Sequence, residues 1–150
     1  MWDVGRLYHT AKKVREQRPM QQIQRVKGVF NGPPDNFPTG ASTGAALLGN
    51  GDVLVAAGGA SESLTFRLSK LDFWQAREEP GPPGGPRGAA RAIGALTLDA
   101  PALNGASYRL EQCIHDATLR GRFEKDGAIL CMTAWTPRGE NVLVVELEAA

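Results

Sequence analysis

The residues best suited to bind a ligand lie side by side near the end of an alternating apolar and polar stretch. Asp72, Phe73 and Trp74 place a carboxylate beside two aromatic rings. An aromatic face can stack on the C–H side of a pyranose, while a carboxylate accepts hydrogen bonds from hydroxyl groups. Asp72 and Trp74 could therefore form a sugar platform. In the structural alternative, Phe73 is core and Trp74 packs at a sheet edge or a domain interface.

Asn50 and Asp52 form a second pair of polar candidates, and they flank Gly51. An Asn-Gly pair between apolar runs is typical of a two-residue type I′ hairpin turn, because both central residues need a positive φ. Asn tolerates that conformation, and Asp bonds nearby backbone N–H groups. Turn chemistry therefore explains both residues, and a role at a ligand site is the second interpretation.

Acid–base chemistry is suggested by Glu111, His115 and Asp116, which lie close together in the sequence. On a continuous strand Glu111 and His115 would share a face and Asp116 would oppose them. A partly exposed strand histidine satisfied by a neighbour is the interpretation we favour. Glu78 and Glu79 lie in a Pro- and Gly-rich segment, which is a poor place to fix a catalytic pair. We therefore predict no catalytic residue.

Composition narrows the class of protein further. Seventeen basic and sixteen acidic residues give a net charge of +1, which provides no general attraction for nucleic acid or anionic membranes. No apolar run can span a bilayer, and the N-terminal region lacks the apolar core of a signal peptide, so the localisation stays open.

The two cysteines, Cys113 and Cys131, could pair or stay free, and we expect them to be small buried residues on neighbouring strands. No metal-ligand spacing or cofactor fingerprint is present, so no metal or cofactor is expected.

The elements that must position these residues are β-strands. Residues 64–70 alternate, which places Leu64, Phe66 and Leu68 on one face. Further strands are expected at 47–49, 53–57, 93–98, 107–110, 117–124, 128–135 and 141–147, with an Asp-Gly hairpin turn at 126–127. No long helix lies between them, so a parallel α/β sheet is disfavoured. The pattern predicts an all-β fold, an antiparallel β-sandwich.

Three segments fall outside this strand pattern. Residues 1–27 have near-helical apolar spacing, which indicates an irregular or partly helical N-terminal arm. Residues 28–44 and 75–91 are rich in Gly and Pro and are expected to be loops. We therefore divide the chain into an N-terminal arm and loop, 1–36, and a β-sandwich domain, 37–150.

The order of several short motifs resembles a known family. A turn LGNGD at 48–52 is followed by LSKLDFW at 68–74, GALTL at 94–98, YRLEQCIHDATLRGRF at 108–123 and ENVLVVEL at 140–147. This series resembles the N-terminal β-sandwich domain of large glycoside hydrolases with an (α/α)6 catalytic barrel, such as the α-L-fucosidase-like and related families. The resemblance covers about residues 37–148. It implies a supersandwich-like fold that this chain would hold only in part.

The resemblance also implies where catalysis would take place. In those enzymes the acid and base carboxylates lie on the helical barrel that follows the sandwich, and family members are often secreted or periplasmic. No barrel follows the last expected strand here, so the resemblance implies a domain fragment, a truncated product or a stand-alone relative. Fold alone does not carry function, and whether this chain is an enzyme stays open.

Two functions from different classes follow. The preferred one is a carbohydrate-associated accessory domain that packs on a catalytic barrel and shapes the rim of a sugar site through Asn50, Asp52, Asp72 and Trp74. Its partners would be carbohydrate and the helical barrel, or a second copy through an exposed apolar face, with no nucleic acid and no membrane. The alternative is a non-catalytic interaction module that binds protein or self-associates. A complete small hydrolase would need a pair of carboxyl groups flanking the scissile bond, which the sequence does not display.

Overall fold

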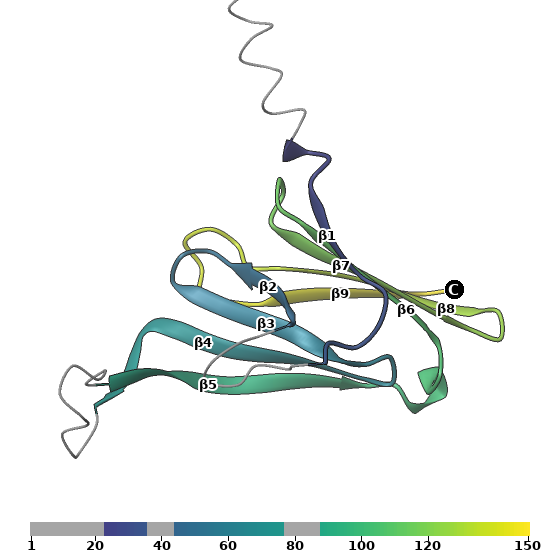
Figure 1. Cartoon of the computed structure of the whole chain (residues 1–150), viewed down its shortest axis with the longest axis horizontal. Coiled ribbons are helices and arrows are strands. Elements are labelled where there is room, and N and C mark those ends of the chain that lie inside the picture. Colours follow the sequence, from purple (N-terminus) through teal and green to yellow (C-terminus); the bar gives the residue numbers. More distant parts are fainter. Residues whose placement is uncertain (1–22, 36–43, 77–87) are drawn as a thin grey trace, which may run out of the picture.

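Two antiparallel sheets packed face to face form the molecule, as a computed structural model shows for residues 23–35, 44–76 and 88–150 (Figure 1). The five-stranded sheet has the order β1-β6-β7-β8-β9, with β1 Lys27–Phe30, β6 Ser107–Cys113, β7 Thr118–Lys125, β8 Ala128–Trp135 and β9 Val144–Ala149. The four-stranded sheet has the order β2-β3-β4-β5, with β2 Ala46–Gly49, β3 Val53–Ala60, β4 Ser63–Ala76 and β5 Gly88–Asp99. The predicted all-β antiparallel sandwich is confirmed, and the sheets do not close into a barrel. The helical pieces expected before residue 23 lie outside the described residues.

The core lies between the sheets and follows from the alternation of side chains along each strand. Leu64 and Phe66 of β4 are 3% and 0% exposed and point inward, as expected. Val55 of β3, on the same sheet as β4, is buried as well, and Leu119 and Phe123 of β7 are buried on the facing sheet. Because successive strand residues point to opposite faces, each apolar and polar alternation supplies one wall of this core.

Two hairpin turns differ in how closely they match expectation. Asp126 and Gly127 join β7 to β8, so the predicted Asp-Gly hairpin turn is confirmed, and their positive φ values of 51° and 83° are those of a type I′ turn. The β2–β3 turn is centred one residue later than expected, because the Asn50 backbone N–H donates to the Val53 carbonyl at 3.2 Å. Only Gly51 has a positive φ there, 96°, so this turn is not type I′. The Asn50 carboxamide bonds the turn backbone and thereby keeps Asn50 itself outside the centre of the turn.

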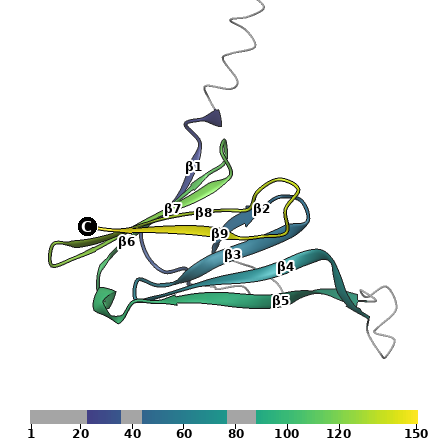
Figure 2. The ribbon, with the colours of Figure 1, turned by 180° about the vertical axis from the view of Figure 1, so that it is seen from behind.

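Several segments expected to be loops are strands. Residues 28–30 belong to β1, which pairs with β6. β4 and β5 also run further than expected, because each supplies hydrogen-bond partners to the other's backbone. The far end of this hairpin projects past the five-stranded sheet in both ribbon views (Figures 1 and 2).

The expectation that Cys113 and Cys131 lie on neighbouring strands is wrong, since β7 separates β6 from β8, and both thiols are free.

A tyrosine near the start of β6, the strand that follows the η1 turn Pro101–Leu103, has an unusual environment. Tyr108 is 9% exposed and packs edge-on against Phe123, with ring centroids 5.4 Å apart. Among the described residues its hydroxyl has no hydrogen-bond partner. Burial raises the pKa of Tyr108 to about 12.

We expect this tyrosine to make the fold sensitive to alkaline pH. The unfolded chain releases the Tyr108 proton near pH 10 and the folded chain near pH 12, so stability falls as the pH rises between them. At pH 11 the loss is on the order of 1 kcal/mol. Tyr108→Phe should match the wild type at pH 8 and be more stable at pH 11 in urea unfolding. An equal loss of stability in both proteins between these pH values would contradict this assignment.

Candidate functional site

A break in the β4–β5 ladder exposes a short segment of β4 beside the β2–β3 turn. β4 advances from Ser69 to Trp74 while β5 advances only from Ala92 to Ala90, so residues 70–73 have no partner on β5. Irregularities of this kind bend a strand and redirect its side chains, and they are common next to binding sites. The predicted Asp72 and Trp74 both lie at this break.

Lys70 is the centre of the polar part of this site. Its ammonium group lies 2.7 Å from the Asp72 carboxylate and 3.0 Å from the Asp52 carboxylate. Hydrogen bonds to Asp72 and then to Asp52 raise the pKa of Lys70, and the bond to Lys70 lowers the pKa of Asp72. Lys70 and Asp72 therefore stay charged over a wide pH range, and the two carboxylates share one ammonium group.

A shallow pocket of about 290 Å³ opens beside these charges. Its walls include the apolar side chains of Leu54, Leu71 and Trp74, and Asp52 and Lys70 line it as well. The Trp74 indole N–H donates to the Leu71 carbonyl at 2.6 Å, which fixes the ring, while 59% of the residue stays exposed. The accessible wall of the pocket is thus mostly apolar, with a fixed aromatic ring and the charged residues Asp52 and Lys70 in its lining, a combination found in small-molecule sites.

Asn50 has a different task, because the protein itself uses its carboxamide. The amide nitrogen donates to the carbonyls of Pro137 at 2.9 Å and Glu140 at 2.8 Å, in the loop between β8 and β9. The amide oxygen accepts from the backbone N–H groups of Asp52 at 3.0 Å and Val53 at 2.8 Å. Asn50 therefore ties the turn of one sheet to a loop of the other, and it positions Asp52 rather than presenting a free polar group.

Of the four residues proposed from the sequence, Asp52, Asp72 and Trp74 gather around Lys70, and Asn50 supports them. Lys70 was not among the candidates. Lys70 lies two residues before Asp72 on a strand, and this spacing places their side chains on one face of the sheet. That spacing is the sequence signal that could have identified Lys70. The structural alternative for Phe73 is wrong, because the residue is 50% exposed and lies outside the core.

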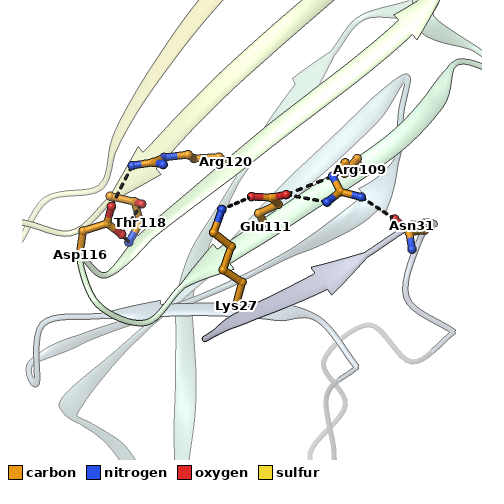
Figure 3. Close-up of polar contacts among 7 residues, drawn as sticks. All are labelled: Lys27, Asn31, Arg109, Glu111, Asp116, Thr118 and Arg120. Atoms are coloured by element: carbon orange, nitrogen blue, oxygen red, sulfur yellow. Dashed lines mark hydrogen bonds and ion pairs between the residues drawn. The ribbon is translucent and has the colours of Figure 1, made fainter. Parts of the chain in front are cut away.

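The acidic residues of β6 and the following turn serve another purpose (Figure 3). Glu111 bonds Lys27 at 2.8 Å and Arg109 at 2.7 Å, and both bonds lower the pKa of Glu111. Asp116 is held by Thr118 and Arg120. His115 lies in the turn after β6 rather than on a strand, so the expected shared face with Glu111 does not exist. These groups form a salt-bridged surface, consistent with the structural interpretation of the acid–base candidates.

Comparisons with known proteins add no identity. No protein-family model and no curated protein matches this chain. Within the described ranges, no helix is long and apolar enough to cross a bilayer. The same ranges contain no cluster of three or more His, Cys, Asp or Glu side chains that could hold a metal ion.

Proposed function

We propose that this protein is a carbohydrate-binding accessory domain whose sugar site is the pocket at the break in the β4–β5 ladder. The observation that carries the proposal is the exposed, fixed indole of Trp74 beside the Asp52–Lys70–Asp72 cluster. The order of motifs that resembles glycoside hydrolase sandwich domains supports the same class of ligand. In such a protein the domain would act next to a catalytic barrel and contribute groups to the rim of its site.

The recognition chemistry divides between two kinds of group. The face of Trp74 would stack on the C–H side of a pyranose, and Leu54 and Leu71 would exclude water from its edge. The carboxylates of Asp52 and Asp72 would accept hydrogen bonds from sugar hydroxyls, and Lys70 would donate to a ring or hydroxyl oxygen. A volume of about 290 Å³ is at the small end for ligand pockets and suits one sugar ring rather than a chain.

Calorimetric titration of the chain with monosaccharides, fucose and fucosides included, tests the proposal. We expect saturable binding at millimolar sugar, at least about tenfold weaker in Trp74→Ala and in Asp72→Asn. The first variant removes the aromatic wall of the pocket, and the second weakens the ion pair that holds Lys70 in the pocket wall. Phe73→Ala is the matched control, since Phe73 is a neighbouring exposed aromatic residue that does not line the pocket. Absence of binding to every sugar, or equal weakening by Phe73→Ala, would contradict the proposed site.

The second candidate, a non-catalytic interaction module, is favoured by one specific observation. Leu71, Phe73 and Ile93 are 67%, 50% and 48% exposed near the ladder break, and large apolar side chains gathered on a surface commonly mark protein contacts. A partner domain could cover them without any sugar. The titration separates the two, because an interaction module would leave every sugar unbound.

A further inference from the structure

The edges of the two sheets differ in how well they are protected against pairing with another strand. The edge strands are β1, β2, β5 and β9. β1 and β2 have four residues each, and short edges offer few hydrogen bonds. β9 exposes Glu146 and Glu148, charges that oppose pairing. β5 has twelve residues, and its stretch 92–98 has no charge and no proline.

The edge of β5 is open along this stretch. Among the described residues β5 hydrogen-bonds only to β4, which leaves its other row of backbone N–H and C=O groups without a strand partner. Each residue from 92 to 97 is exposed. A long, uncharged and open edge is a template for another strand, because a second row of backbone hydrogen bonds can form on it.

Apolar side chains accompany this open edge. Leu96 lies on the inward face of β5, as its pairing with Phe66 shows, yet it is 43% exposed. Beside it, a cleft of about 230 Å³ between the two sheets is lined by Leu98, Met132 and Leu147 among others. Pairing at the β5 edge would therefore bury apolar surface as well as satisfy backbone groups.

We infer that two copies of this chain pair through the β5 edge, antiparallel about a two-fold axis, so that the two four-stranded sheets become one continuous sheet. Such a contact is self-complementary, because each copy offers the same strand to the other. No charges meet within stretch 92–98, whereas self-pairing of β9 would bring Glu146 and Glu148 against their own copies. The charge pattern thus selects β5 among the long edges.

Steric fit selects a register centred on Ala95. In that register Leu96 of one copy lies opposite Gly94 of the other, on the inward face of the sheet. No atom lies within 4 Å of the position that a Cβ on Gly94 would occupy. Gly94 therefore leaves room for Leu96 of the second copy. This contact involves the edge of β5 and none of the residues that line the proposed sugar site.

Sedimentation of the full chain between micromolar and millimolar concentration tests this contact. We expect a reversible dimer whose dissociation constant rises at least about tenfold in Leu96→Lys, because two lysines would face each other's sheet edge. Leu47→Lys is the matched control: Leu47 is an exposed leucine, 37%, on the opposite edge strand of the same sheet, and this variant should dimerise like the wild type. A monomer at all concentrations, or equal weakening by both variants, would overturn the inference.

Cross-linking keeps the test decisive if Leu96→Lys folds poorly. Opposed residues of antiparallel strands have Cα atoms about 4.5–5.5 Å apart, which lies within the range that a disulfide spans. Ala95→Cys should therefore form a disulfide-linked dimer under mild oxidation, while Leu47→Cys and the wild type should not. A cross-link that is no faster in Ala95→Cys than in Leu47→Cys would exclude the register centred on Ala95.

Discussion

Replacing Asn50 by Asp is expected to destabilise the protein by about 3 kcal/mol at pH 7, and by clearly less near pH 3. The Asn50 amide nitrogen donates to the carbonyls of Pro137 and Glu140 at 2.9 and 2.8 Å. A carboxylate there loses both donors and places a negative charge against two carbonyl oxygens. Protonation at low pH removes that charge and restores one donor, so the loss should shrink as the carboxyl group titrates.

The matched control is Asn141→Asp. Asn141 is exposed in the same loop region before β9, so it introduces the same charge without the same contacts. Urea unfolding of wild type, Asn50→Asp and Asn141→Asp at both pH values separates a local contact from a net-charge effect. Equal stability of the two variants at pH 7 would show that the contacts of Asn50 contribute little to holding the two sheets together.

Gly59→Ala is expected to cost about 3 kcal/mol or more, because the residue faces two separate obstacles. Gly59 lies near the end of β3 with φ of 112°, a conformation that residues with a Cβ adopt only under strain. A Cβ at this position would also lie 2.4 Å from the backbone carbonyl oxygen of Ser63 on β4. The backbone must shift to relieve that contact, which disturbs the β3–β4 pairing.

Gly51→Ala isolates the first obstacle, the strain of a positive φ. Gly51 also has a positive φ, 96°, but no atom lies within 4 Å of a Cβ built there. Its cost should be the conformational strain alone, about 1–2 kcal/mol. Thermal and urea unfolding of both variants should rank Gly59→Ala as the less stable by a clear margin. The reverse order would mean that the close approach of β3 and β4 is easily relaxed.

Strand positions were predictable from this sequence because a half-buried strand leaves a period-2 pattern. The alternation around Phe66 and around Phe123 identifies both inward faces, and Asp126-Gly127 identifies a hairpin. Residues 28–30 show no such period-2 pattern. Gly28 and Phe30 flank a single valine in a Gly- and Pro-rich context, and only pairing with β6 makes the segment a strand.

The candidate site was predictable in part. Asp72 and Trp74 stand out by residue type: Trp74 lines the pocket with Asp52 and Lys70, and Asp72 is ion-paired with Lys70. The role of Asn50 could not be derived, because its partners lie 87 and 90 residues away in a loop of the other sheet. Lys70 was not predictable as a site residue from its residue type alone, because a lysine on an alternating strand is ordinarily a solvated side chain. Its importance arises from the turn that brings Asp52 beside it.

The most direct test of the sugar site is a two-dimensional ¹H–¹⁵N spectrum of the indole N–H groups during titration with the best-binding monosaccharide. Of the three tryptophans, Trp74 lines the pocket, whereas Trp135 ends β8 and does not line it. Once assigned, these two indole signals report separately on the site and on the rest of the fold. A saturable shift of the Trp74 signal, with Trp135 unchanged, is the predicted result. An unchanged Trp74 signal at saturating sugar would contradict the proposal that this pocket binds carbohydrate.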